Sequence, residues 1–476
     1  MSHTLPIPWT TREILDATGG ELLCGDLRRR FSRVGIDSRE ISPEDFFFAI
    51  IGERLDGHEF ASAVVDQGVR GLAIGRQQAG QLPVAAWEAK TTTCIAVADT
   101  TRALGDLAAF NRRRAKASVA AITGSNGKTT TRKLTAGVVV RQFSTLATAG
   151  NFNNQIGLPV TLLGLSPDHQ WAVVELGSNN PGEIARLADI CSPDIGVLTN
   201  IGPAHLEGLG SLDGVMREKG DLVKGLGPGG KAVLNADDPR VLQLARQTQR
   251  EVLLYGWSQE ATIRAENIKE DEQTISFRLI LGRESITVEL NSPGRYMISN
   301  ALAAAAVGYL LGICPAAVKA GLESFKPASG RMNISHLSNS IHIIDDTYNA
   351  NPESMKAALA TLEQMRSGGR GIFAAGDMLE LGARAPELHG NVGALAARSG
   401  IDRLYASGEH AAAVAAGARK EGMPAANTIT GSREEIIEDL IDWLQPGDWV
   451  LVKGSRGMAM EKVVDGLKQW AEESIG

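Results

Sequence analysis

The segment Thr123-Gly124-Ser125-Asn126-Gly127-Lys128-Thr129-Thr130 limits the possible folds of this chain more than any other feature. It follows the apolar run from Val119 to Ile122 and precedes a segment of helical character, so the pattern is strand, glycine-rich loop, helix. Glycines let backbone N–H groups turn towards phosphate oxygens, and the N-terminus of the next helix favours a bound anion. In such loops the lysine reaches the β- and γ-phosphates and the next hydroxyl binds magnesium. The segment therefore predicts a P-loop for a nucleoside triphosphate.

The match to the usual P-loop pattern GxxxxGK[ST] is incomplete, because its first glycine would fall at Ile122. The loop is a shortened version of the pattern. A plain glycine turn without a ligand is the alternative interpretation.

Similar strand-and-loop units recur along the rest of the chain. They are WAVVELG, IGVLTNIG and KAVLNADD in the middle, and IHIID, GIFAAGD and WVLVKGS in the last third. Apolar runs that alternate with helical segments predict α/β folds with parallel sheets and crossover helices. A chain of 476 residues suits about three domains. We expect a small N-terminal α/β domain at 1–110, a central P-loop domain with a parallel sheet at 111–326, and a Rossmann-like C-terminal domain at 327–476.

Composition and charge exclude several classes of partner. The net charge is -7 and no long basic run is present, so nucleic acid is not an expected partner. The short basic cluster Arg112, Arg113, Arg114 and Lys116 favours a solvated linker. The four cysteines form no CxxC pair, which disfavours a zinc site or a disulfide framework. No stretch approaches the 18 or so apolar residues of a membrane span and the N-terminus lacks a signal-peptide pattern, so we expect a cytoplasmic protein without membrane insertion. We also expect a monomer.

Several polar residues follow predicted strands, where open α/β sheets place their ligands. Glu175 ends one strand and has no positive neighbour in its local sequence, so its carboxylate at the sheet edge is costly unless a cation or water compensates it; a solvated strand-end glutamate is the alternative. His205 is equally ambiguous. The local sequence around Lys219 favours an exposed helix with ion pairs. Asp346 and Asn349 follow one apolar run, and Lys453 to Arg456 follow another. Their convergence on the sheet edges favours one shared site.

Eight segments, in this order, resemble the Mur ligase family over nearly the whole chain: TGSNGKTTT, GNFNNQIGLPVTLL, VVELGSNNPGEI, NIGPAHLEGLG, NADDP, NALAAAA, IIDDTYNANPESM and VKGSRGMAME. The resemblance implies an ATP-dependent ligase that joins a carboxylate to an amine through an acyl phosphate. The NFNNQIG and GDMLELG segments are similar to the member whose substrates are UDP-N-acetylmuramoyl-tripeptide and D-alanyl-D-alanine.

The resemblance also implies roles for individual residues. ATP would be bound by residues 123–130 together with Asn300 and Arg331. Two Mg²⁺ ions would be held by Thr129, Glu175, His205 and Lys219, the last as a carbamylated lysine. Catalytic roles would fall to Lys128, Lys219, His205 and Asp346. Substrates would contact Asp37, Ser38, Arg39, Asn153, Asn154, Asn349, Lys453, Ser455 and Arg456. The loop Gly52-Glu53-Arg54-Leu55-Asp56-Gly57-His58 resembles a binding loop for the uridine diphosphate end. Tyr296 and Met297 replace a common His-Asn pair, which would leave base recognition to Asn300.

Four other interpretations stay open. A sibling ligase that adds diaminopimelate or lysine as the third residue should carry a DNPR-like motif where this chain has GDMLELG. Folylpolyglutamate synthetase shares the P-loop domain and the chemistry. A P-loop nucleotide switch would hydrolyse ATP slowly, without response to amines or uridine nucleotides. A catalytically inactive homologue is disfavoured by the intact GKTT, Glu175, His205 and Lys219 set.

Overall fold

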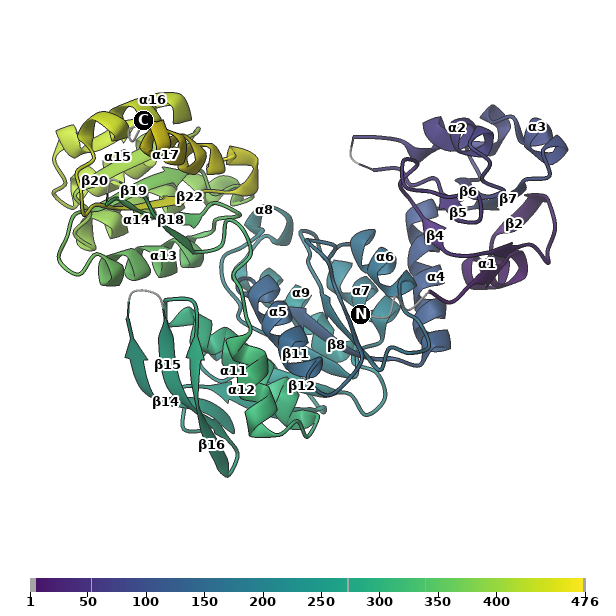
Figure 1. Cartoon of the computed structure of the whole chain (residues 1–476), viewed down its shortest axis with the longest axis horizontal. Helices are drawn as coiled ribbons and strands as arrows, with labels where there is room; N and C mark the ends of the chain where they lie inside the picture. The colour runs from purple at the N-terminus through teal and green to yellow at the C-terminus, as the bar shows by residue number, and fades with distance from the viewer. Residues whose placement is uncertain (1–5, 53, 272–273, 339, 474–476) are drawn as a thin grey trace.

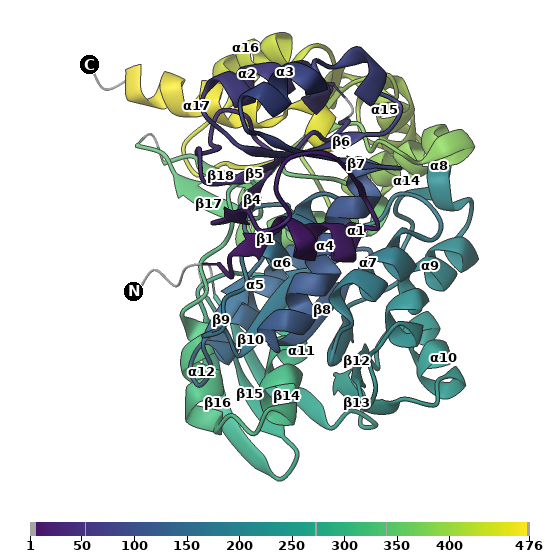
Figure 2. The same ribbon diagram turned by 90° about the vertical axis from the view of Figure 1, so that its right-hand side faces the viewer.

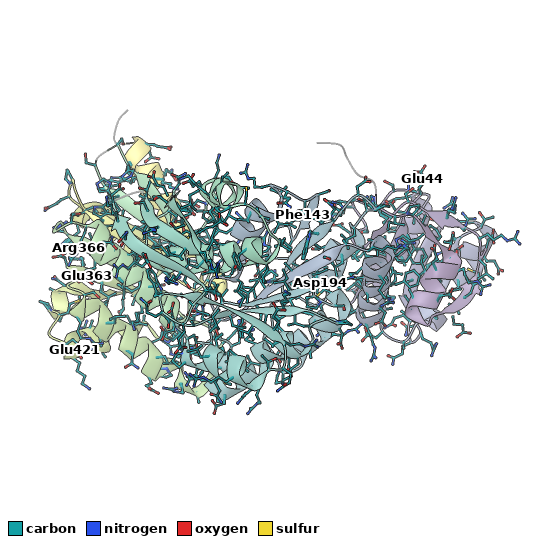
Figure 3. All side chains as sticks on the ribbon, turned by 90° about the horizontal axis from the view of Figure 1, so that it is seen from below. Glu44, Phe143, Asp194, Glu363, Arg366 and Glu421 are labelled. Carbon is teal, nitrogen blue, oxygen red and sulfur yellow. The ribbon has the colours of Figure 1, made fainter. Side chains whose placement is uncertain are left out.

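The computed structural model describes residues 6–52, 54–271, 274–338 and 340–473. Three α/β units follow one another along the chain, and the first and last lie on the same side of the central one (Figures 1 and 2). The molecule is elongated, with Glu44 near one end, Glu421 near the other, and Phe143 and Asp194 between them (Figure 3). Within the described ranges, no helix is long and apolar enough to cross a membrane.

The first unit is a five-stranded sheet of order β2-β7-β6-β5-β4. Its strands are β2 (Glu21–Cys24), β4 (Val34–Gly35), β5 (Phe46–Phe48), β6 (Gly71–Gly75) and β7 (Thr93–Val97). Only the β2–β7 pair is antiparallel. Helices α1 (Thr11–Thr18), α2 (Ala61–Asp66) and α3 (Val84–Ala89), and the short pair β1 (Trp9–Thr10) and β3 (Arg30–Phe31), complete the unit.

Helix α4 (Thr100–Ala115) joins the first sheet to the central one across residue 110. The solvated linker predicted from its basic end is wrong. Arg112 forms an ion pair with Asp194 at 2.8 Å, and Arg114 forms one with Glu13 at 3.0 Å while its guanidinium lies 4.0 Å from the centre of the Trp9 ring. The side chains of both arginines are less than one-fifth exposed. These cations hold neighbouring elements together instead of being solvated.

The central sheet has nine strands in the order β16-β15-β14-β13-β12-β11-β8-β10-β9. They are β8 (Ser118–Thr123), β9 (Thr145–Ala147), β10 (Trp171–Glu175), β11 (Ile195–Leu198), β12 (Lys231–Asn235), β13 (Glu251–Gly256), β14 (Ile263–Glu270), β15 (Ile275–Leu281) and β16 (Glu284–Leu290). From β14 to β9 along this sheet, each strand pairs in parallel with its neighbour, as predicted. The antiparallel strands β15 and β16 extend the sheet beyond that prediction.

Helices cover the central sheet: α5 (Lys128–Val139), α6 (Gly157–Leu163), α7 (Glu183–Cys191), α8 (Leu206–Leu209), α9 (Leu212–Lys224), α10 (Pro239–Gln247), α11 (Tyr296–Leu310) and α12 (Pro315–Glu323). The alanine-rich segment forms most of α11, which is buried around nearly its whole circumference. Small side chains let α11 pack closely on both the sheet and α5.

The last unit is a six-stranded sheet of order β17-β18-β22-β19-β20-β21, parallel except for the β17–β18 pair. Its strands are β17 (Asn333–His336), β18 (His342–Asp346), β19 (Gly371–Gly376), β20 (Arg403–Ser407), β21 (Thr428–Thr430) and β22 (Trp449–Lys453). Its helices are α13 (Pro352–Met365), α14 (Ala385–Arg398), α15 (Ala411–Lys420), α16 (Arg433–Trp443) and α17 (Glu461–Glu473). Capping boxes start α13 at Asn351 and α16 at Ser432.

Candidate active site

A cavity of about 780 Å³ lies where the central and last units meet. Its walls come from the P-loop, the ends of β10 and β11, the start of α11 and the loop after β18. Fifteen predicted site residues line it: Ser125, Asn126, Gly127, Lys128, Thr129, Thr130, Asn153, Asn154, Glu175, His205, Asn300, Arg331, Asp346, Asn349 and Lys453. Eight others lie outside its lining: Thr123, Gly124, Lys219, Ser455, Arg456, Asp37, Ser38 and Arg39.

The P-loop has a shape that only glycine permits at two positions. Gly124 and Gly127 have φ angles of +145° and +78°. A Cβ atom at Gly124 would lie 2.0 Å from Oγ1 of Thr199, and one at Gly127 would lie 2.3 Å from Oδ1 of Asn300. Asn300 thus lies directly against the loop, so this loop is a tightly specified turn at the head of α5.

Lys128 is the first residue of α5, and its ammonium donates hydrogen bonds to the carbonyls of Gly124 at 2.8 Å and Ser125 at 3.3 Å. Burial lowers the pKa of Lys128 below its usual value. Arg331, from the segment before the last sheet, donates to Oγ1 of Thr129 at 3.1 Å. Two cations therefore border the place where the loop amides would meet phosphate.

Glu175 ends β10 with its side chain 3% exposed. Its Oε1 accepts a hydrogen bond from Nδ2 of Asn153 at 2.8 Å, whereas Oε2 accepts none from the residues that the structure describes and forms an ion pair with Nε of Arg132 at 3.8 Å. A buried carboxylate oxygen left without a partner is costly, and a bound cation would remove that cost. This oxygen has only a long ion pair with Arg132 and no hydrogen bond among the described residues, so it fits a magnesium ligand beside the hydroxyl-bearing P-loop. Among the residues described, no group of three His, Cys, Asp or Glu side chains could hold a metal, so other ligands must complete the site.

Lys219 lies on α9 and is fully buried. The exposed position favoured by its local sequence is therefore wrong, because the ion-pair pattern cannot reveal that this helix face packs on α7. Its ammonium donates to Oγ of Ser178 at 2.7 Å. Burial lowers the pKa of Lys219 to about 7, and the charge of Lys128 contributes. A substantial neutral fraction at pH 7 gives the amine the form that reacts with carbon dioxide.

The lowered pKa predicts how stability depends on pH. Between pH about 7 and about 10.4, the unfolded chain holds the Lys219 proton and the folded chain does not, so this group makes stability rise with pH, by up to about 1.4 kcal/mol per unit. Lys219→Met removes the titration. We expect the stability advantage of Lys219→Met over wild type to shrink from pH about 7 to about 10, measured as thermal midpoints in CO₂-free buffer without nucleotide. Lys224→Met, at an exposed position on α9, is the control. Parallel pH curves for Lys219→Met and wild type would contradict the assignment.

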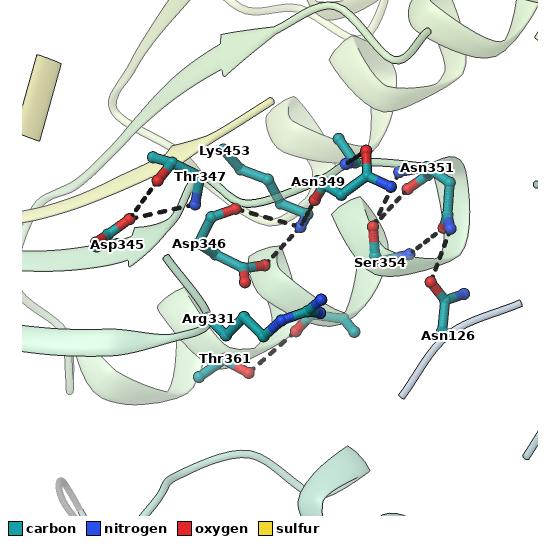
Figure 4. Close-up of polar contacts among 12 residues, drawn as sticks. Asn126, Arg331, Asp345, Asp346, Thr347, Asn349, Asn351, Ser354, Thr361 and Lys453 are labelled. Atoms are coloured by element: carbon teal, nitrogen blue, oxygen red, sulfur yellow. Dashed lines mark hydrogen bonds and ion pairs between the residues drawn. The ribbon is translucent and has the colours of Figure 1, made fainter. Parts of the chain in front are cut away.

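The loop after β18 joins the last unit to the P-loop (Figure 4). Lys453 forms an ion pair with Asp346 at 2.6 Å and donates to the carbonyl of Asn349 at 2.7 Å. Burial raises the pKa of Asp346, and the Lys453 ammonium opposes that rise. Nδ2 of Asn351 donates to Oδ1 of Asn126 at 2.7 Å. The two units thus touch through polar groups at the cavity itself.

Ser455 and Arg456 lie outside the lining of this cavity, although the Arg456 guanidinium lies 5.8 Å from the centre of the ring of Tyr348, which lines it. Ser455 accepts from the backbone N–H of Leu379 at 2.8 Å and lies 3.4 Å from the carbonyl of Ala350. Arg456 is largely exposed, with Glu461 at 3.6 Å. The hydrogen bonds of Ser455 fix neighbouring loops of the last unit.

The residues predicted to bind the uridine diphosphate end lie in the first unit. Asp37 and Arg39 form an exposed ion pair at 2.6 Å. In the second predicted loop, Nδ1 of His58 lies 2.6 Å from Asp56, while Nε2 accepts from the backbone N–H of Gly75 at 2.8 Å. Glu53 lies outside the described residues.

Tyr296 and Met297, which replace the common His-Asn pair, both line the cavity at the start of α11. Met297 is nearly fully buried. Tyr296 also borders a smaller hollow of about 320 Å³ with Trp257, Arg295 and Ser299. An aromatic ring therefore stands at this wall of the cavity.

Sequence reasoning missed several residues that contact the predicted set, among them Arg132, Ser178, Asn351 and Glu380. Ser178 and Asn351 belong to polar loops that follow strands, a signal that could have found them. The local sequence of Arg132 indicates only a cation on a helix and gives no sign of its contact with Glu175. Glu380 contacts Nδ1 of His205, and this contact lowers the pKa of the Glu380 carboxyl. No sequence pattern indicates the contact between Glu380 and His205, because the two residues are 175 positions apart.

Family models match three consecutive parts of the chain. They are the Mur ligase family catalytic domain at residues 30–112, the Mur ligase middle domain at 122–308, and the Mur ligase glutamate ligase domain at 330–456. The chain belongs to the Mur ligase family. This Mur ligase is 37% identical to the UDP-N-acetylmuramoyl-tripeptide--D-alanyl-D-alanine ligase of Escherichia coli over 97% of its own length and 98% of the relative.

Solved structures are similar to this Mur ligase over nearly the whole chain. MurF from Acinetobacter baumannii has a TM-score of 0.88 at 32% identity, covering 98% of this chain and 99% of that one. MurF ligase from Thermotoga maritima in complex with ADP has a TM-score of 0.81 at 26% identity, covering 93% and 98%. The three-unit architecture of this Mur ligase is therefore that of the MurF structures.

Proposed function

We propose that this Mur ligase uses ATP to join D-alanyl-D-alanine to UDP-N-acetylmuramoyl-tripeptide, giving the pentapeptide precursor of peptidoglycan. The observation that carries the proposal is a single cavity that unites a P-loop, a buried carboxylate with one oxygen that has no hydrogen bond among the described residues, and polar groups of the last unit. The identity to the curated E. coli ligase, spread over 97% of the chain, supports the choice of substrates. The ADP complex of the Thermotoga maritima relative supports the nucleotide.

In the proposed reaction, the terminal carboxylate of the tripeptide attacks the γ-phosphate of ATP, and ADP leaves. The resulting acyl phosphate is attacked at its carbonyl carbon by the amine of D-alanyl-D-alanine. Phosphate leaves, the nitrogen loses a proton, and a peptide bond is formed. Phosphoryl transfer of this kind depends on positioning and on neutralisation of charge more than on covalent help from the protein.

The P-loop residues 123–130 hold the triphosphate in this scheme, with Lys128 and Arg331 supplying positive charge and Asn300 bordering the nucleotide. Bound Mg²⁺, as two ions held by Thr129, Glu175, His205 and the carbamate of Lys219, would neutralise charge on the phosphate oxygens. Carbamate formation needs a neutral amine and CO₂ and releases one proton, which suits a lysine with a pKa of about 7.

The remaining predicted residues are assigned to the two substrates. Asp37, Ser38 and Arg39 of the first unit would bind the uridine diphosphate end. Asn153, Asn154 and Asn349 line the cavity and would contact the reacting peptide ends, with Asp346 and Lys453 shaping the wall of the last unit. Closure of this wall on the P-loop would exclude water, which an acyl phosphate requires.

The test follows phosphate release from ATP and Mg²⁺ with UDP-N-acetylmuramoyl-tripeptide, with and without D-alanyl-D-alanine, while mass spectrometry follows the peptide product. Product heavier by the dipeptide, formed only with both substrates, is expected. Tripeptides with diaminopimelate and with lysine are compared in parallel. Phosphate release that ignores both substrates would favour a nucleotide switch, and extension of a dipeptide precursor by one amino acid would favour the sibling ligase.

A further inference from the structure

The GDMLELG segment, Gly376–Gly382, reaches from the last unit to the central one. It follows β19, and α8 lies beside the last unit in Figure 1. The backbone N–H of Glu207 on α8 donates to the carbonyl of Glu380 at 3.0 Å. This segment therefore places its own side chains against the central unit, at the rim of the cavity.

The segment is anchored firmly in the last unit. The backbone N–H of Met378 donates to Nε2 of His389 at 2.9 Å, and that of Leu379 donates to Oγ of Ser455 at 2.8 Å. Glu380 itself has a φ angle of +63°, in the left-handed region that non-glycine residues seldom adopt. A strained residue on an anchored loop is held in one orientation, and such strain is concentrated at functional sites.

His205, on the other side of the contact, is also held in a defined orientation. It precedes α8 with a φ angle of +54°, and its side chain is 18% exposed. Its Nδ1 contacts Oε2 of Glu380. A glutamate ionised at neutral pH can only accept hydrogen bonds, so Nδ1 of a neutral His205 carries the proton and the lone pair is on Nε2. In that tautomer, the lone pair of Nε2 can bind a metal ion.

We propose that Glu380 is a positioning residue for His205, supplied by the last unit, which fixes the imidazole in the tautomer and orientation that bind Mg²⁺. The inference rests on the proposed function, because it takes His205 as a metal ligand. Carboxylates that accept from the distal N–H of a ligating histidine orient the ring and raise its basicity. Because Glu380 and His205 belong to different units, metal binding and the docking of the last unit on α8 favour each other.

Three variants separate this role from a structural one. Glu380→Ala removes the acceptor, whereas Glu380→Gln keeps a neutral oxygen acceptor. Glu387→Ala is the matched control, because it removes a carboxylate from the same unit whose partner is the exposed Arg384. Binding of Mn²⁺ in the presence of a non-hydrolysable ATP analogue, measured by electron paramagnetic resonance, needs no turnover. We expect Mn²⁺ affinity to fall about 10- to 100-fold in Glu380→Ala, to recover in part in Glu380→Gln, and to stay unchanged in Glu387→Ala.

A second readout is the tautomer itself. In ¹⁵N-histidine spectra of wild type, the signals that His205→Gln removes should show protonation at Nδ1, and Glu380→Ala should shift them towards a mixture of tautomers. Equal Mn²⁺ affinities of Glu380→Ala and Glu387→Ala would overturn the proposal, as would Nε2 protonation of His205 in wild type. The Glu380 side chain is 46% exposed, so its variants should fold, which circular dichroism checks. Wild type that binds Mn²⁺ and nucleotide but forms no peptide would contradict the proposed function instead.

Discussion

Lys128→Ala is expected to lower kcat of the proposed ligation by about 1,000-fold or more, since a cation placed on a transferring phosphoryl group can contribute about 10³ to 10⁵ in rate. Lys128 opens α5, and its ammonium donates to two carbonyls of its own loop, which phosphate oxygens can displace. Within the described part of the chain, no acidic side chain is hydrogen-bonded to the Lys128 ammonium, so its charge is available to a nucleotide. Steady-state kinetics with saturating ATP, D-alanyl-D-alanine and tripeptide measure the loss.

The matched control for this prediction is Lys133→Ala. Lys133 lies on the same helix but outside the lining of the cavity, so its removal should change kcat by less than about twofold. A Lys128→Ala enzyme that keeps more than about one-tenth of wild-type kcat would show that the loop does not hold the reacting phosphates.

Lys453→Met is expected to destabilise the last unit by about 3–5 kcal/mol, because it leaves the Asp346 carboxylate without its partner in a buried place. The Lys453 side chain is 2% exposed, and its ammonium also satisfies the carbonyl of Asn349. Hydrogen exchange of the amides in β18 and β22 reports the opening free energy of this sheet separately from the other units.

Two further variants test whether the unpaired charge of Asp346 causes this loss of stability. Asp346→Leu combined with Lys453→Met removes both charges and should cost less than Lys453→Met alone, because no uncompensated ion remains. Arg456→Met breaks an exposed pair with Glu461 and should cost no more than about 1 kcal/mol. A double variant less stable than Lys453→Met would mean that packing, and not charge, dominates at this position.

Features governed by neighbouring residues could be predicted from the sequence. Gly124 and Gly127 are required by the loop's own backbone, and the capping boxes at Asn351 and Ser432 act within one helical turn. The parallel strands around Glu175 follow from apolar runs alternating with helices. These signals placed most of the candidate site on one edge of the sheet, because the carboxyl ends of parallel strands meet there.

Features governed by distant residues could not be predicted in this way. Lys219 has a local sequence typical of an exposed helix, yet the packing of α9 on α7 buries it and changes its proton affinity. Arg112 forms its ion pair with Asp194, which is distant in the sequence, so composition alone suggested a solvated linker. The antiparallel strands β15 and β16 extend a sheet whose earlier strands predicted only parallel pairing.

The sequence by itself therefore determined the P-loop, the α/β class and the family, since each depends on backbone geometry and periodicity over short stretches. Tertiary structure alone decided which charges are buried, which oxygen of Glu175 has no hydrogen bond among the described residues, and which side chain of the last unit contacts His205. The reason is physical: desolvation and ion pairing depend on what surrounds a group in space, and residues brought together by three packed units can be hundreds of positions apart.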